Sequence, residues 1–294
     1  MKSNLAPVVI IGCERVKLLK KLIISLKKND LSKNTKAYFF IDFTNNEKAK
    51  KKIIFLLKNT NFFNKKKIIL RKKKFGLKKN ISNAINYVFR YHDKIIVLED
   101  DLELTKYALL YFNRSLSKFK DNDKIYTISG FSFNNKNDSE IFKNKNLMLA
   151  KRPSSWGWAT WKKKWFKLKT FNVENINYYS SSYGNDLILM GLKKKIRMLD
   201  SWAYDWTIRH IIHDKYCAYP RKSYIINNGH DKHSNNNFFK IKKNNSNLNN
   251  KVIKSYNYQL ENKMIRDKFK SYYSQFFLIF IIKLVLFKIL RFIK

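Results

Sequence analysis

The sequence predicts an α/β protein in which helices flank both faces of a mixed, largely parallel sheet. Short apolar runs of strand length alternate along the chain with longer stretches whose apolar residues recur at helical spacing. Alternation of this kind is typical of parallel strands joined by right-handed helical crossovers. The 294 residues are 45% hydrophobic and 16% aromatic, which is enough to fill a sizeable core.

The alternation begins at residues 7–12 (PVVIIG), an apolar run of strand length that ends in a small residue. Residues 15–28 follow with a broad apolar face and predict the first helix. The same unit recurs, with further strands expected at 37–42, 67–70, 95–98 and 125–128 and further helices at 48–57, 81–91 and 105–119.

Three carboxylates, Glu99, Asp100 and Asp101, directly follow the strand at 95–98. That strand is apolar throughout, as a central strand of a parallel sheet is. Ligands of open α/β sheets bind at the carboxyl ends of their strands, and carboxylates placed there need a cation or a catalytic role. Because the chain has only 21 acidic residues, this triplet is the first candidate site.

The formal net charge of +41 favours polyanionic partners such as anionic lipid or phosphorylated substrates. No nucleic-acid-binding motif is present and the positive charge is spread along the chain, so no nucleic-acid partner is expected. Cys13 and Cys217 are too few for a disulfide framework, and no export signal precedes the first strand. A cytoplasmic location is therefore expected.

Four motifs occur in a fixed order between residues 6 and 234: PVVIIGCER, FGLKKNISNAINYVF followed by IIVLEDDLEL, SSWGWATW, and SWAYDWTIR. In this order they resemble the nucleotide-sugar-dependent glycosyltransferases of the GT-A fold. The resemblance is to bacterial family 2-like sugar transferases and to the eukaryotic N-acetylglucosaminyltransferase that begins complex N-glycan branches. It implies a GT-A, Rossmann-like domain that uses a nucleotide-sugar donor.

The resemblance implies that Asp101 holds a divalent ion, Mn²⁺ or Mg²⁺, which neutralises the departing diphosphate. Glu99 and Asp100 are then expected to accept hydrogen bonds from ribose hydroxyls or metal-bound water. A simpler alternative is that Asp101 caps a helix that begins at residue 102.

The resemblance also assigns the acid and arginine after the first strand, Glu14 and Arg15, to contacts with the nucleotide. Alternatively, Arg15 is a surface residue that opens a helix. Asp42 follows the second strand, a position suited to recognising a base or ribose, and is a candidate on its position alone.

Asp205 is the candidate catalytic base, because an inverting transferase needs one carboxylate to take the proton from the acceptor hydroxyl. Asp200 is the fallback, and an N-cap for a helix at 207–212 is the structural alternative for Asp205. Trp156 and Gly157 are expected near the sugar or acceptor. The later tryptophans of the cluster, Trp158, Trp161 and Trp165, are expected in the core.

Beyond the predicted 1–238 domain, the chain changes character. The loop at 227–236 resembles the family's lid over the donor diphosphate, with Lys232 and His233 near the phosphates. Residues 239–270 are rich in Asn and Lys and read as a linker. Residues 271–294 predict an amphipathic helix whose Lys and Arg residues form one basic sector, which suits an anionic membrane surface better than a membrane span; a helix packed on the domain is the alternative.

Together these features predict a metal-dependent, inverting hexosyl- or N-acetylhexosaminyltransferase at the inner face of a bacterial cell membrane. It would transfer sugar from a nucleotide-sugar, expected to be a UDP-sugar, to a glycan or glycolipid precursor of a surface polysaccharide such as lipopolysaccharide or capsule. The alternative is a basic nucleotide-binding protein, associated with membrane or nucleic acid, that catalyses nothing.

Overall fold

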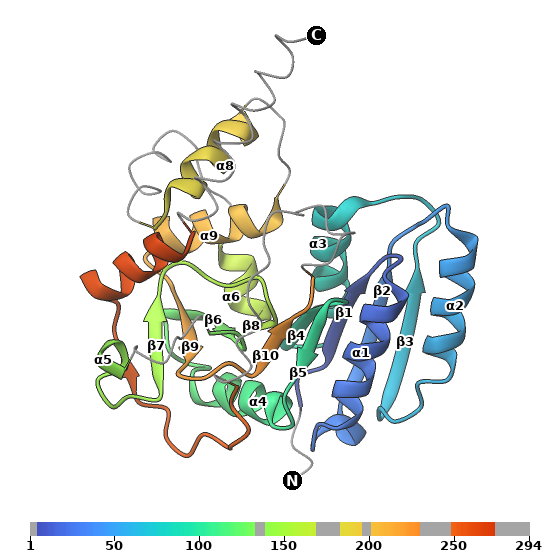
Figure 1. Cartoon of the computed structure of the whole chain (residues 1–294), viewed down its shortest axis with the longest axis horizontal. Helices are drawn as coiled ribbons and strands as arrows, with labels where there is room; N and C mark the ends of the chain where they lie inside the picture. Colours follow the sequence, from blue (N-terminus) through green and yellow to red (C-terminus); the bar gives the residue numbers. More distant parts are fainter. Residues whose placement is uncertain (1–4, 133–138, 169–182, 196–200, 230–247, 274–294) are drawn as a thin grey trace, which may run out of the picture.

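The computed structural model describes residues 5–132, 139–168, 183–195, 201–229 and 248–273. Within these residues, nine strands form one sheet (Figure 1). Along the chain they are β1 (Val8–Gly12), β2 (Lys36–Ile41), β3 (Lys65–Leu70), β4 (Lys94–Glu99), β6 (Ile125–Ser129), β7 (Leu147–Ala150), β8 (Trp158–Trp161), β9 (Tyr216–Pro220) and β11 (Tyr258–Gln259). Their spatial order is β11-β7-β9-β6-β8-β4-β1-β2-β3.

The first half of the sheet is parallel and the second half is mixed. β1 pairs in parallel with β2 and β4, and β2 pairs in parallel with β3. β8 then runs antiparallel to both β4 and β6. Because β8 runs in the opposite direction, its first residue, Trp158, lies opposite Val97 near the carboxyl end of β4.

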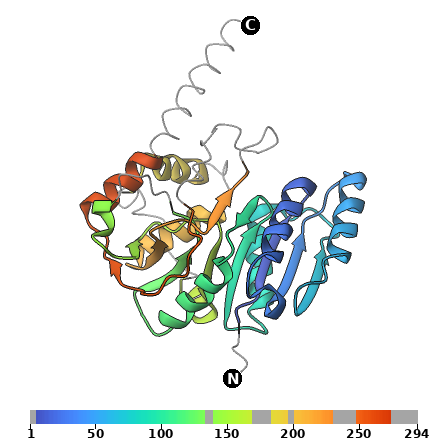
Figure 2. The same cartoon turned by 60° about the horizontal axis from the view of Figure 1, so that its bottom comes forward.

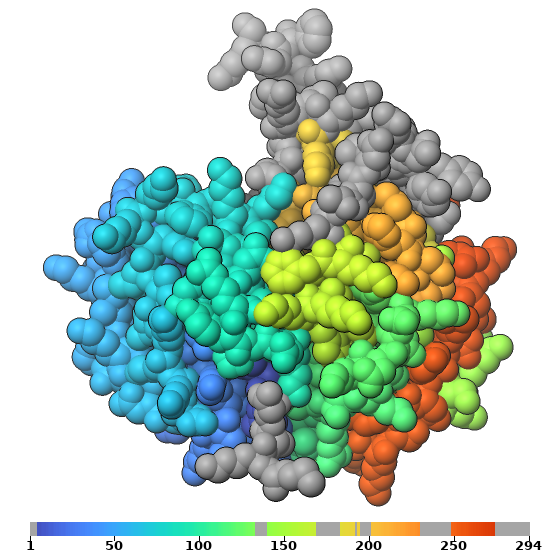
Figure 3. Space-filling view, turned by 180° about the vertical axis from the view of Figure 1, so that it is seen from behind, coloured from blue at the N-terminus to red at the C-terminus, as the bar shows by residue number. Residues whose placement is uncertain are grey.

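Helices cover both faces of the sheet and confirm the predicted fold class. The helices of one face are α1 (Val16–Lys27), α2 (Glu47–Lys58) and α4 (Ala108–Lys118), and those of the other are α3 (Gly76–Val88), α6 (Lys162–Lys167) and α9 (Trp202–Ile212). Figure 3 shows the molecule from behind, with the second face toward the viewer and segments of α3 and α6 side by side. A 3.1 Å hydrogen bond from Trp165 Nε1 to Asn86 Oδ1 joins these two helices. In Figure 2 the N-terminal strand–helix units form one side of the molecule and the later elements the other.

The core follows from the alternation of side chains along the central strands. In β4, Ile96 and Leu98 pack on the α1 and α4 face, whereas Ile95 and Val97 pack on the α3 and α9 face. An unbroken apolar strand therefore supplies two cores, as expected for a buried central strand.

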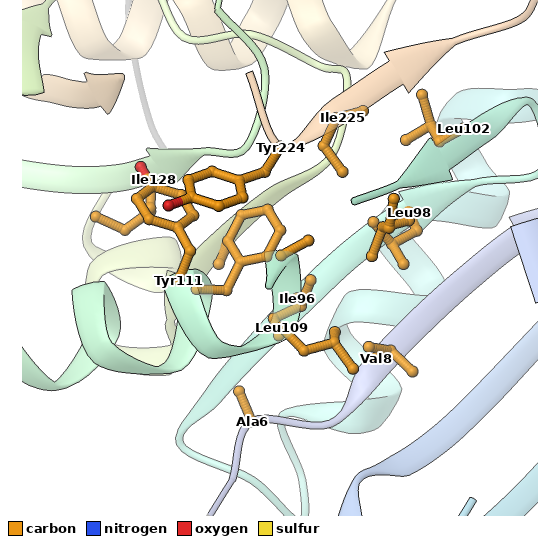
Figure 4. Close-up of a cluster of buried hydrophobic side chains, with 14 of the residues drawn as sticks. Ala6, Val8, Ile96, Leu98, Leu102, Leu109, Tyr111, Ile128, Tyr224 and Ile225 are labelled. Atoms are coloured by element: carbon orange, nitrogen blue, oxygen red, sulfur yellow. The ribbon is translucent and has the colours of Figure 1, made fainter. Parts of the chain in front are cut away.

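A second, two-stranded sheet lies beside the carboxyl end of β4. Its strands are β5 (Leu102–Leu104) and β10 (Ile225–Asn227), which pair antiparallel. Figure 4 shows Leu102 and Ile225 in the same buried cluster as Leu98 and Tyr224. Because residues 102–104 form a strand and α4 begins at Ala108, Asp101 is not the cap of a helix, and that alternative is wrong.

Residues 248–273 belong to the domain, whereas the sequence predicted a linker up to residue 270. β11 pairs in parallel with β7, and residues 263–273 are helical. Ile265 and Phe269 of this helix are buried against Met148 and Tyr219. The Asn- and Lys-rich composition concealed these few apolar anchors. The remaining elements are η1 (Ser32–Asn34), α5 (Ser139–Phe142) and α8 (Asn185–Lys195).

The predicted amphipathic helix at 271–294 lies outside the described residues beyond residue 273. Among the helices that are described, none combines the length and apolar character needed to cross a membrane.

Candidate functional site

The acidic triplet lies at the carboxyl edge of the sheet, where β4 leads into β5. Arg15, which follows β1, forms ion pairs with the two aspartates. Its Nη1 is 2.9 Å from Asp101 Oδ2, and its Nη2 contacts Asp100 Oδ1. The side chains of Asp100 and Asp101 are only 3% and 12% exposed, and that of Arg15 is 27% exposed. Neighbouring parallel strands thus bring the predicted residues of the first and fourth strands together.

Burial and repulsion between neighbouring carboxylates make Glu99 and Asp100 costly to ionise. Burial raises the pKa of Glu99 above its usual range, and Asp101 and Asp100 raise it further. Burial also raises the pKa of Asp100 to about 6, although the Arg15 guanidinium opposes the shift. Burial alone would lower the pKa of Arg15, but Asp100 and Asp101 outweigh it and raise it. The guanidinium is therefore the cation that holds the two aspartates together.

Asp42 has a structural role that the sequence did not predict. Its Oδ1 accepts hydrogen bonds from the backbone N–H groups of Phe43 and Phe75, and its Oδ2 accepts one from Gly76, each at 2.9 Å. The carboxylate therefore anchors the first turn of α3, which begins at Gly76 rather than at residue 81. Its predicted contact with a nucleotide stays a prediction.

An open cleft of about 510 Å³ lies beside the ends of β1 and β2, within the size range of small-ligand sites. Glu14 lines it and accepts a 2.8 Å hydrogen bond from Thr44 Oγ1. Burial raises the pKa of the adjacent Cys13 thiol to about 11, so this cysteine stays protonated near neutral pH. The cleft is lined by Cys13, Glu14, Phe43, Thr44, Asn45, Asn46, Lys72, Lys73 and Lys74. The sequence did not single out Lys72, Lys73 and Lys74 as site residues, because the chain has 62 Lys and Arg residues.

The end of β10 closes the other side of Asp101. The backbone N–H of Asn228 donates to the carbonyl of Asp101 at 2.8 Å. A Cβ atom placed on Gly229 would lie 2.2 Å from Asp101 Oδ2 and 3.0 Å from Asn227 Oδ1. The carboxylate of Asp101 and the amide oxygen of Asn227 therefore both lie close to Gly229, and a larger residue at this position would have to displace the carboxylate.

The described residues near Asp101 fit a divalent ion that is shared with a ligand. Among the described residues, no group of three His, Cys, Asp or Glu side chains is placed to hold a metal. Near Asp101, Asn227 Oδ1 accepts the backbone N–H of Gly229 at 2.7 Å and keeps one lone pair, and Asn228 Oδ1 is buried without a hydrogen-bond partner in the described part of the chain. One carboxylate and amide oxygens, completed by phosphate and water, suit Mg²⁺ or Mn²⁺.

Trp156 and Gly157 lie next to the same strand, β10. The ring of Trp156 packs edge-on against Phe131, with centroids 4.6 Å apart. Gly157 has φ +63°, and an added Cβ would lie 2.9 Å from Cγ1 of Ile225. β10 thus connects these two residues to Asp101. The core role predicted for the later tryptophans is confirmed, because Trp158, Trp161 and Trp165 are all buried.

Asp205 lies in the first turn of α9, and Ser201 is the N-cap of that helix. The cap alternative for Asp205 is therefore wrong. Its side chain is 11% exposed and lies between two ammonium groups: Lys78 Nζ is 3.1 Å from Oδ2, and Lys194 Nζ contacts Oδ1. Sequence spacing did not indicate these partners, because Lys78 is on α3 and Lys194 on α8. The fallback Asp200 and the lid residues Lys232 and His233 lie outside the described residues.

Comparison with known proteins gives distant structural likenesses alone. No protein-family model and no curated protein matches the chain. Staphylococcus aureus TarS is 12% identical, with 75% of this chain and 36% of that chain covered and a TM-score of 0.48. The mannosyltransferase PcManGT from Pyrobaculum calidifontis, in complex with GDP-Man and Mn²⁺, is 10% identical over 72% of this chain and 70% of that one, with a TM-score of 0.43. The glycosyltransferase GlyE of Streptococcus pneumoniae is 15% identical over 74% of this chain and 45% of that one, with a TM-score of 0.36.

This chain spans little more than a third of the length of the first of these structures. At such identities and scores the likenesses carry no argument about activity. The function proposed below is therefore argued from the structure of this chain. That structure has a nine-stranded mixed sheet with helices on both faces and an acidic triplet at its carboxyl edge.

Proposed function

We propose that the protein is a glycosyltransferase that uses a nucleotide-sugar donor and a divalent metal ion. One observation carries the proposal: Asp100 and Asp101 directly follow the central strand β4 and pair with Arg15, next to a cleft large enough for a nucleoside. Open α/β sheets bind nucleotides at this edge. A diphosphate leaving group needs positive charge, which Arg15 and a metal at Asp101 would supply.

In this proposal the cleft binds the nucleoside, and Glu14 lies at its floor with Thr44. Arg15 pairs with the diphosphate, because a guanidinium matches phosphate oxygens through two parallel hydrogen bonds. Asp101 would hold the metal ion, which would supply positive charge to the departing diphosphate. Glu99 and Asp100 accept hydrogen bonds from ribose or from metal-bound water, and Trp156 with Gly157 borders the sugar.

Asp205 is proposed as the base of an inverting transfer. It would take the proton of the acceptor hydroxyl while the acceptor oxygen bonds to the anomeric carbon and the bond to the diphosphate breaks. Both of its oxygens are paired with ammonium groups, from Lys78 and Lys194. Because each carboxylate oxygen has more than one lone pair, the acceptor hydroxyl would approach a lone pair that neither ammonium group uses. Asp200 remains the fallback base.

The acceptor is proposed to be a glycan or glycolipid precursor, reached at an anionic membrane surface on the cytoplasmic side. The amphipathic pattern of 271–294 and the net charge of +41 support this part of the proposal. Its test is truncation after Tyr273, because the Tyr273 ring covers the buried guanidinium of Arg152 and belongs to the domain. The shortened protein should move from the membrane fraction to the soluble fraction, and no redistribution would contradict membrane binding by this segment.

The enzymatic proposal is tested by incubating the protein with a panel of nucleotide-sugars and Mn²⁺ and measuring nucleoside diphosphate release. Asp101→Asn should lower the rate at least 100-fold, because it removes the charge that faces the metal and Arg15. Asp30→Asn is a matched control, since Asp30 is 43% exposed and lies 3.8 Å from Lys106, in a separate ion pair. Nucleotide binding without any release or transfer would favour a non-catalytic nucleotide-binding protein.

A further inference from the structure

Arg15 is paired with the carboxylate oxygen of Asp101 that would coordinate a metal ion. Its Nη1 is 2.9 Å from Oδ2 of Asp101, the same oxygen that faces Gly229 and Asn227. Its Nη2 is paired with Asp100 at the same time. The guanidinium therefore spans the two aspartates with two separate N–H groups, one to each carboxylate, and makes a bidentate pair with neither.

A metal ion that entered this space alone would meet two obstacles. Its charge would repel the guanidinium, which is partly buried and bonded to the same carboxylate. If Arg15 moved away, its charge would lose both partners. In the part of the chain that the structure describes, no third His, Cys, Asp or Glu side chain is placed to strengthen metal binding.

A nucleoside diphosphate would remove both obstacles. Its oxygens offer the guanidinium a bidentate partner and offer the metal the ligands that the described residues lack. Arg15 lies at the end of β1, next to Glu14 and Cys13 of the cleft, and 27% of its side chain is exposed. It can therefore turn from the aspartates to a diphosphate without crossing the core.

We propose that Arg15 is a placeholder cation that keeps the divalent ion off Asp101 until a nucleoside diphosphate group arrives. Arg15 is thus a positioning residue that makes metal binding depend on donor binding. This inference rests on the proposed function for the identity of the ligand, a diphosphate, and on the ion pairs for its mechanism.

The test measures Mn²⁺ binding by the loss of the free-ion electron paramagnetic resonance signal, without nucleotide and with UDP or GDP, after subtraction of the signal lost to the nucleotide in samples without protein. The wild-type protein should bind Mn²⁺ weakly alone and at least about tenfold more tightly with the nucleotide that it accepts. Arg15→Met should bind Mn²⁺ alone at least about tenfold more tightly than the wild type and show a smaller enhancement by nucleotide, to which the phosphate ligands still contribute. Arg15→Lys, a point charge that cannot span both aspartates, should lie between them.

Arg90→Met is the matched control, because it removes the same charge from an exposed residue whose guanidinium lies over Tyr87, away from the acidic triplet. Thermal melting of each variant shows which ones fold, and Arg15→Lys keeps the test valid if Arg15→Met does not. The inference is overturned if neither Arg15 variant binds Mn²⁺ more tightly than the Arg90 variant, or if the wild type binds Mn²⁺ equally with and without nucleotide. A protein that follows the expected binding pattern but transfers no sugar would refute the proposed function and leave the placeholder role standing.

Discussion

Replacing Gly229 with alanine tests whether Asp101 is part of the reacting site. The added Cβ would lie 2.2 Å from Asp101 Oδ2, whereas a carbon and an oxygen approach each other no closer than about 3.2 Å. The carboxylate must therefore move by about 1 Å, which also disturbs its 2.9 Å pair with Arg15. A displacement of about 1 Å at a reacting group can cost about 100-fold in rate. We expect Gly229→Ala to lower kcat/KM for sugar transfer by about that factor.

The assay is transfer from the preferred donor to a competent acceptor, together with thermal unfolding of each variant. Gly76→Ala is the control, because Gly76 has φ +73° but an added Cβ would meet no atom within 4 Å. Backbone strain there should cost about 1 kcal/mol of stability, and the rate should fall far less than in Gly229→Ala because no carboxylate is displaced. If Gly229→Ala keeps more than a third of the wild-type kcat/KM, or if Gly76→Ala loses as much activity, the placement of Asp101 at the reacting centre is refuted.

Three further predictions concern stability. Burial lowers the pKa of His210 to about 3, whereas in the unfolded chain it is about 6.5, so between these values only the unfolded state binds a proton and the folded state loses stability as pH falls. In urea titrations, the free energy of unfolding of the wild type should fall by about 2 kcal/mol more than that of His210→Gln between pH 7 and 5. Equal losses would contradict this prediction. Gly157→Ala should cost about 2–4 kcal/mol in urea unfolding, because φ +63° strains alanine and Ile225 crowds the Cβ; a loss under 1 kcal/mol would mean that Ile225 yields freely. Lys164→Met should cost about 3 kcal/mol in thermal unfolding, because the buried ammonium donates to three main-chain carbonyls at 2.8 to 2.9 Å, and an unchanged melting temperature would show that water replaces those bonds.

The sequence predicted the first half of the fold well because its signals there are strong and local. Each expected strand and helix up to residue 128 is present, and most ends differ by three residues or fewer. Apolar runs of period two and 3.6 identify such elements without tertiary information. The exception is the start of α3, which lies at Gly76 because the carboxylate of Asp42, 34 residues earlier in the chain, accepts its backbone N–H. No local pattern carries that information.

The second half was harder to predict because its elements are short and depend on partners far away in the sequence. β5 has three residues and β11 has two, too few to show a period. β8 was expected as part of an aromatic core, and its antiparallel placement between β4 and β6 comes from the sheet, not from its own residues. The unbroken apolar run of β4 indicated a central strand that is covered on both faces, but not which segments would cover it.

The candidate site divides in the same way. The position of Asp101 could be predicted, because the end of an apolar strand can be located from sequence alone and ligands of parallel sheets bind at such ends. The sequence could not predict the ion pair between Asp101 and Arg15, because that pair depends on the pairing of β1 with β4. The ammonium groups around Asp205 could not be predicted at all, because 62 basic residues offer far too many candidates for two specific ion pairs.

The first turn of α3 joins the two halves of the proposed site. At Gly76 it is held by the carboxylate of Asp42, whose loop borders the nucleotide cleft, and two residues later Lys78 holds Asp205 at 3.1 Å. The cleft beside Asp42 and the proposed base Asp205 are therefore linked in the structure by one helical turn. A shift of this turn would alter the ion pair between Lys78 and Asp205.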